Sequence, residues 1–142
     1  MLLIDVNVLV YAHRQDADDH DVYLGWLQSL LDSQQAFGVS ELALSGFLRI
    51  VTHPKIFKTP SPLSRASAFA RTLRAHEHAV PVLAGERHWN IFMDLCAQTQ
   101  ATGNLVPDAY FAALAIESGC EWITADADYA RFPGLRWRHP LR

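Results

Sequence analysis

The chain has few charged residues, only two cysteines and no apolar run long enough to cross a bilayer. Charged residues make up 19% of its 142 residues, whereas hydrophobic residues make up 50%. The formal net charge of -3 excludes a nucleic-acid binder that is basic overall. The apolar content is sufficient for the core of one domain, which we expect to span residues 1–142. It also indicates a buried interface, with a second copy or another protein.

The two cysteines, Cys96 and Cys120, lack the spacing of a metal site and are too few for a disulfide framework. Free thiols are typical of a reducing cytoplasm. Residues 1–5 (MLLID) lack the basic start, long apolar stretch and cleavage signal of a secretory leader. A cytoplasmic location without membrane association is therefore expected.

Short apolar runs alternate with segments of helical periodicity along the whole chain. Strands are expected at 2–5, 37–39, 80–83, 120–124 and 135–138, and helices at 7–13, 22–31, 40–53, 63–76, 86–100 and 107–118, with one helical turn at 126–131. Pro107 is placed at the first position of its helix. Trp89, Phe92, Met93 and Cys96 are expected to form one apolar helix face. Because strands separated by helices need crossover connections, this order predicts a three-layer α/β/α fold with a mainly parallel sheet of four to five strands.

Four acidic residues lie at element ends that face the same side of such a fold. Asp5 and Asp126 each follow an apolar strand, whereas Glu41 and Asp108 each open a helix. In open α/β sheets the carboxyl ends of the strands line one crevice, where ligands bind. Four carboxylates in one crevice repel each other unless a cation intervenes.

The chemistry of these ligands indicates which cation is expected. Hard carboxylate oxygens suit Mg²⁺ or Mn²⁺, and the lack of an accompanying cysteine or paired histidine argues against zinc. Metal ions held in this way activate water and neutralise charge on a phosphate. The sequence therefore predicts metal-dependent phosphodiester cleavage.

Each acid also has a purely structural explanation. Glu41 and Asp108 complement a helix dipole, Asp5 caps the next helix, and Asp126 and Asp128 are typical turn residues. The joint arrangement favours a site, because unrelated turn acids need not meet on one face. Asp5 also follows three apolar residues, at the edge of a core where an unpaired charge is costly.

The motifs around these acids resemble those of a known family. Residues 3–9 (LIDVNVL) resemble the opening motif of PIN-domain ribonucleases, and residues 124–129 (TADADY) resemble their late motif. Ser40-Glu41 and Pro107-Asp108 resemble the two middle acid positions. In length and motif order, nearly the whole chain is similar to VapC-type toxins of bacterial VapBC toxin–antitoxin pairs.

This resemblance implies a PIN-like domain that acts as a Mg²⁺-dependent endoribonuclease, with Mn²⁺ as a possible substitute. It implies that Asp5, Glu41, Asp108 and Asp126 are the catalytic and metal-site residues, with Asp128 as a less certain metal ligand. Asn7 and Thr124 would orient the carboxylates or the attacking water. The implied partners are an RNA substrate, a second copy in a homodimer, and a cognate VapB-type antitoxin.

Two other functions remain open from the sequence. One is a phosphatase in which Asp5 forms an aspartyl-phosphate, although Asn7 stands where such enzymes carry a second aspartate and no suitably placed lysine follows. The other is a PIN-like domain that binds RNA or protein without cutting. The complete set of four acids disfavours this second alternative.

Some aromatic and basic residues are candidate RNA contacts. Trp137, between Arg136 and Arg138, is the best candidate for base stacking, whereas the other three tryptophans are expected to pack in the core or a dimer interface. Five cations could contact phosphates, and each is equally explained as an ordinary surface residue: Arg14, Arg49, Lys55, Lys58 and Arg65.

Overall fold

The computed structural model describes residues 1–142 and consists of six α-helices, one short 3₁₀ helix and five strands. The strands are β1 (Leu2–Ile4), β2 (Phe37–Val39), β3 (Ala79–Pro81), β4 (Glu121–Ile123) and β5 (Trp137–Arg138). The helices are α1 (Val6–His13), α2 (His20–Asp32), α3 (Glu41–Val51), α4 (Leu63–Arg74), α5 (His88–Thr99), α6 (Leu105–Ser118) and the 3₁₀ helix η1 (Ala127–Arg131). None of the helices combines the length and apolar character needed to span a bilayer.

The five strands form one sheet in the order β3-β2-β1-β4-β5, and every neighbouring pair is parallel. This confirms the predicted α/β class. The strand β1 lies at the centre of the sheet, and Pro81 lies in the edge strand β3, where its missing N–H costs least.

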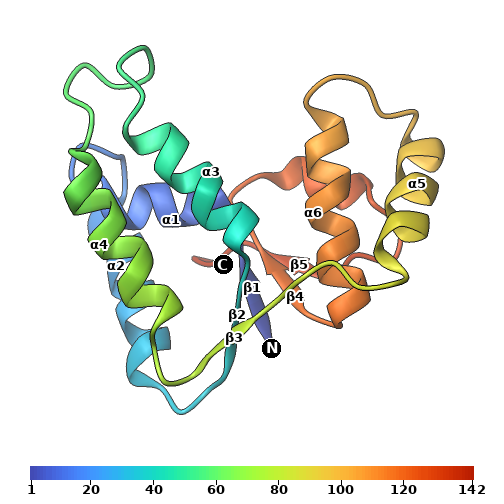
Figure 1. Ribbon diagram of the computed structural model, residues 1–142, viewed down its shortest axis with the longest axis horizontal. Helices are drawn as coiled ribbons and strands as arrows, with labels where there is room; N and C mark the ends of the chain where they lie inside the picture. The colour runs from blue at the N-terminus through green and yellow to red at the C-terminus, as the bar shows by residue number, and fades with distance from the viewer.

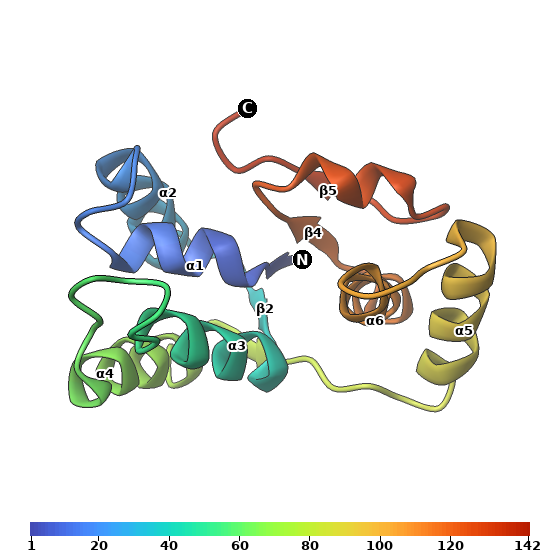
Figure 2. The same ribbon diagram turned by 90° about the horizontal axis from the view of Figure 1, so that it is seen from above.

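Helices cover both faces of the sheet, and Figures 1 and 2 show them in two groups with the strands between. Successive side chains on a strand point to opposite faces. Leu3 and its partner Trp122 therefore belong to the core formed with α5 and α6, whereas Ile4 and its partner Ile123 belong to the core formed with α1 to α4. The layers are α/β/α, as predicted.

Close packing at the sheet depends on Gly38 in β2. A Cβ atom there would lie 2.8 Å from Cγ2 of Val82 and 3.2 Å from the backbone oxygen of Leu2. No side chain fits at that distance without a shift of the sheet. Gly38 therefore leaves room for the side chains of Val82 and Leu3 beside β2.

Besides shifts of one or two residues at the ends of several elements, two differences from the sequence-based expectation have a clear physical reason. Pro107 is the third residue of α6, because the turn at Thr102 and Gly103 starts the helix at Leu105. Proline is tolerated there, since the first four N–H groups of a helix have no partner within it.

The expected apolar face of α5 is also only partly correct. Phe92 is buried, but Trp89 is 61% exposed and Met93 is 47% exposed. The helix packs mainly on α6, through a stripe of His88, Phe92 and Leu95. One neighbouring helix covers only one such stripe, so the rest of α5 faces outward.

Candidate active site

The carboxylate of Asp5 is buried at the end of the central strand, where it caps α1. Its Oδ1 accepts a 2.6 Å hydrogen bond from the Val6 N–H, and its Oδ2 accepts a 2.6 Å hydrogen bond from the Thr124 hydroxyl. Its own N–H donates to the carbonyl of Ile123, which continues the ladder between β1 and β4. The parallel pairing of these two strands thus brings the first and last motifs into contact.

Thr124 and Asn7 connect the two strand ends further. The Thr124 hydroxyl oxygen accepts the Asp126 N–H at 3.0 Å and an amide N–H of Asn7 at 3.4 Å. The Asn7 side-chain oxygen accepts the Ala125 N–H at 3.2 Å. Asn7 and Thr124 therefore fix the turn that positions Asp126 beside Asp5.

Asp108 reaches the same region from the first turn of α6. Its Oδ1 accepts a 3.2 Å hydrogen bond from the hydroxyl of Tyr129, a buried residue of η1. Asp126 caps η1, since its Oδ1 accepts the Asp128 N–H at 2.9 Å. One 3₁₀ helix therefore links the positions of Asp108 and Asp126.

These three acids line one cavity of about 670 Å³. Its walls come from the start of α1, one face of α3, the start of α6 and η1, together with Phe92 of α5. Asn7, Tyr129 and Arg49 also contribute to the lining. The cavity lies at the carboxyl ends of β1 and β4, where a doubly wound sheet binds its ligands.

The electrostatics of the cavity disfavour negative charge. Burial raises the pKa of Asp5 from 3.8 to about 6, and the charges of Asp108 and Asp126 act in the same direction. Burial also raises the pKa of Asp108, with further increases from Asp126 and Asp128. A cation bound among these carboxylates would offset both the burial and the repulsion.

Glu41 and Asp128 do not line the cavity. Glu41 opens α3 after the Ser40 cap, but its side chain is 61% exposed and forms a 3.1 Å ion pair with Arg74 of α4. Asp128 is exposed and does not line the cavity. Leu42, the neighbour of Glu41, does line it.

Most of the residues considered as RNA contacts lie away from the cavity. Trp137 is half-buried in β5 and packs against the core beneath α6, outside the cavity. Arg14 is buried and paired with Asp16. Of the five cations considered above, only Arg49 lines the cavity. Phe111 of α6 also lines it and was missed, although its place three residues after Asp108 puts both on one helix face.

The residues present fit a hard divalent cation. No group of three or more His, Cys, Asp or Glu side chains is preassembled as a metal cage. Mg²⁺ does not require one, because it binds through one or two carboxylates and keeps waters or substrate phosphates as its other ligands. Asp5, Asp108 and Asp126 supply oxygen donors in one cavity, two of them with raised pKa values.

Comparison with known proteins shows the family. Residues 2–135 match the model of the PIN domain. The chain is 43% identical to VapC ribonuclease Mb2897 of Mycobacterium bovis over 141 residues, which cover 99% of this chain and 96% of that protein. It is 40% identical to ribonuclease VapC25 of Mycobacterium tuberculosis, with 99% of both chains covered.

Solved structures agree on the fold. The toxin–antitoxin complex VapBC2 of Rickettsia felis, bound to a promoter DNA fragment, superposes with a TM-score of 0.70 at 16% identity, covering 97% of each chain. The sarcin–ricin loop-cleaving toxin VapC20 of Mycobacterium tuberculosis superposes with a TM-score of 0.66 at 14% identity, covering 96% of this chain and 99% of that one. With the domain match over residues 2–135 and the 43% identity, the chain belongs to the PIN-domain family, in the group that holds the VapC ribonucleases.

Proposed function

We propose that this protein is a Mg²⁺-dependent endoribonuclease and the toxin of a type II VapBC-type toxin–antitoxin system. The observation that carries this proposal is the convergence of Asp5, Asp108 and Asp126 in one cavity at the carboxyl edge of the sheet. The ribonuclease activity named for relatives at 40–43% identity supports it.

Asp5, Asp108 and Asp126 are proposed to hold the metal, with Glu41 as a fourth carboxylate and Asp128 as a further candidate. Mn²⁺ is expected to substitute for Mg²⁺, since both prefer oxygen ligands. The bound ion would lower the pKa of a coordinated water and neutralise charge on the phosphate.

Glu41 can join the group by rotation of its side chain. Its ion pair with Arg74 joins two side chains that are each 61% exposed, and such pairs contribute little to stability. A cation in the cavity would offer the Glu41 carboxylate a stronger interaction than Arg74 does. The position of Glu41 in the first turn of α3, next to the lining residue Leu42, supports this proposal.

The other residues prepare the carboxylates for this role. Thr124 and Val6 hold the two oxygens of Asp5, so that its orientation is set before a ligand enters. Tyr129 does the same for Asp108. Burial raises the pKa of the Tyr129 hydroxyl, with the nearby carboxylates as a further cause, so it remains a hydrogen-bond donor at neutral pH.

The alternative of a phosphatase is less well supported by this geometry. Both oxygens of Asp5 already accept hydrogen bonds, which would weaken it as a nucleophile. Asn7, at the position of the second aspartate in such enzymes, is instead engaged with Ala125 and Thr124.

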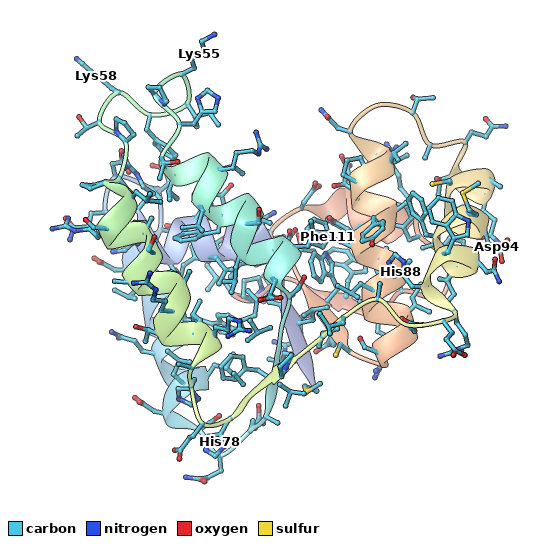
Figure 3. All side chains as sticks on the ribbon, in the orientation of Figure 1. Lys55, Lys58, His78, His88, Asp94 and Phe111 are labelled. Carbon is cyan, nitrogen blue, oxygen red and sulfur yellow. The ribbon has the colours of Figure 1, made fainter.

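RNA cleavage by the purified protein tests the proposal. Total cellular RNA would be incubated with Mg²⁺, with Mn²⁺ and with a chelator, using wild type, Asp108→Asn and Asp94→Asn. Asp94 is an exposed acid on the outer side of α5 and serves as the matched control (Figure 3). Discrete fragments are expected from wild type and Asp94→Asn with either metal, and none from Asp108→Asn or with chelator. Equal cleavage by all three proteins would contradict the proposed site.

The toxin assignment implies two protein partners. A VapB-type antitoxin is expected to bind the chain and suppress cleavage, and the chain itself is expected to form a homodimer. Co-purification of the tagged protein with the product of its neighbouring gene tests the first partner. Light scattering of the isolated protein tests the second, and a monomeric mass would contradict the homodimer.

A further inference from the structure

The wall of the cavity formed by α6 includes an aromatic ring. Phe111 of α6 is half-buried, lines the cavity, and projects from α6 toward α3 (Figure 3). Its ring stacks on that of Trp122, with 5.3 Å between centroids and 24° between planes. Trp122 is fully buried in β4, so the orientation of Phe111 is fixed from behind.

The opposite wall carries a single cation. Arg49 projects from the last turn of α3, on the same helix face as Leu42 and Ser45. It is exposed, forms no ion pair, and is the only basic residue among those lining the cavity. Every other charged residue of the lining is one of the three aspartates.

We propose that Phe111 and Arg49 form a nucleotide subsite, in which Phe111 stacks on an unpaired base and Arg49 binds an adjacent phosphate. This rests on the proposed function, because it names two residues that would position the RNA substrate in the same cavity. Both residues are positioning residues that place the chain across the carboxylates.

The ring geometry selects an unpaired base. A base accepts an aromatic ring on its face only when it has left the stack, which occurs in single strands, loops and bulges. A cavity of about 670 Å³ has the size of a small-ligand pocket, which is sufficient to hold a nucleotide.

The single cation of the lining provides a contact for a phosphate. In a cavity with three aspartates, a lone unpaired cation on the opposite wall matches a phosphate that lies beside the metal-binding region.

Paired variants test the subsite in two ways. Binding of a fluorescein-labelled single-stranded RNA would be measured in the Asp108→Asn background, with the same strand annealed to its complement as the duplex probe. Cleavage would be measured in the wild-type background.

The variants separate the ring from the charge. Phe111→Tyr keeps the ring, whereas Phe111→Leu removes it. Arg49→Gln removes the charge, and Arg71→Gln is the matched control at an exposed arginine of α4 that does not line the cavity.

Phe111→Leu is expected to weaken single-strand binding roughly ten-fold, with Phe111→Tyr close to wild type, since stacking on a protein ring is sequence-tolerant and contributes at this level. Arg49→Gln is expected to reduce the slope of log K against log salt by about 0.7, the value for one phosphate contact on a single strand. Arg71→Gln is expected to leave that slope unchanged. The duplex probe is expected to bind more weakly than the single strand.

The outcomes separate this proposal from the proposed function. If wild type cleaves RNA while Phe111→Leu and Arg49→Gln match Arg71→Gln in binding and cleavage, the subsite is wrong and the ribonuclease stands. If no protein cleaves RNA but the variants weaken binding as expected, the subsite stands and the proposed activity is wrong. Arg49→Gln provides an independent test should Phe111→Leu fold poorly.

Discussion

The hydroxyl of Thr124 donates a 2.6 Å hydrogen bond to Oδ2 of Asp5, and these residues are 119 positions apart in the chain. Both side chains are buried, with Thr124 completely inaccessible. The same hydroxyl oxygen accepts the N–H of Asp126. Thr124 therefore joins the two acids that end the neighbouring strands β1 and β4.

Thr124→Val is expected to destabilise the protein by about 1–3 kcal/mol, because a side chain of the same shape would leave the Asp5 oxygen and the Asp126 N–H without their partner. Thr124→Ser keeps the hydroxyl and is expected to recover most of the loss. Urea unfolding of the three proteins at one pH measures the difference. Equal midpoints for Thr124→Val and wild type would show that the bond contributes nothing to stability.

Asp5→Asn is expected to change how stability depends on pH. The folded-state pKa of Asp5 is raised to about 6 from 3.8, so the protonated form is favoured by folding and its contribution is lost as pH rises through 6. Relative to Asp5→Asn, the metal-free wild type should therefore lose stability between about pH 4 and pH 6, by roughly 3 kcal/mol at most.

The measurement is urea unfolding in chelator across that pH range, with Asp94→Asn as the exposed control. Only the difference between wild type and Asp5→Asn is interpreted, because acids far from Asp5 contribute equally to both proteins. If the difference in unfolding free energy between wild type and Asp5→Asn stays constant from pH 4 to pH 7, the raised pKa of Asp5 is contradicted.

The sequence predicted the fold class because local patterns report on it directly. The buried runs at Leu2–Ile4 and Glu121–Ile123 are too short for helices, and the segments between them have helical periodicity. Strand order could not be predicted in the same way. The placement of β1 between β2 and β4 depends on which helices pack on which face, and no local pattern encodes that choice.

Only part of the candidate site, likewise, could be predicted from the sequence. Asp5 and Asp126 end neighbouring parallel strands, so their proximity follows from topology. The position of the Glu41 side chain does not, because a long exposed side chain takes the nearest partner, and Arg74 is 33 residues away. Whether Phe111 and Arg49 line the same cavity depends on how α3 is placed relative to α6, which is a property of packing.

Glu41→Gln tests whether this exposed carboxylate contributes to the proposed metal site. Cleavage is expected to fall roughly ten-fold or more, the range seen when a group supporting a metal is lost. Arg74→Gln is the matched variant, since it breaks the same ion pair but leaves the carboxylate free to turn toward the cavity. Its cleavage rate should equal or exceed that of wild type. Unchanged cleavage in Glu41→Gln would restrict the site to the three aspartates.

Two glycine substitutions are expected to have opposite effects on stability. Gly25 lies in α2 with no atom within 4 Å of an added Cβ, so Gly25→Ala should stabilise by about 0.5–1 kcal/mol. Gly38→Ala places its Cβ 2.8 Å from Val82 and should destabilise by about 1–3 kcal/mol. Thermal unfolding of both variants measures this, and a stabilised Gly38→Ala would contradict the close packing of β2.

Metal binding should appear as stabilisation of the native state, whether or not an RNA substrate is known. A cation that binds only the folded chain stabilises it by about 2.7 kcal/mol at a concentration of 100 times its Kd. Mn²⁺ is therefore expected to raise the melting temperature of wild type and of Asp94→Asn, and to have little effect on Asp5→Asn or Asp108→Asn. Without metal, Asp5→Asn and Asp108→Asn should be more stable than wild type. Each substitution removes a buried carboxylate and its repulsion of the remaining ones. A crossover of this kind, with a variant more stable than wild type in chelator and less stable in Mn²⁺, requires that the same carboxylates both repel each other and bind the ion. Parallel shifts in all four proteins would place the metal elsewhere on the chain.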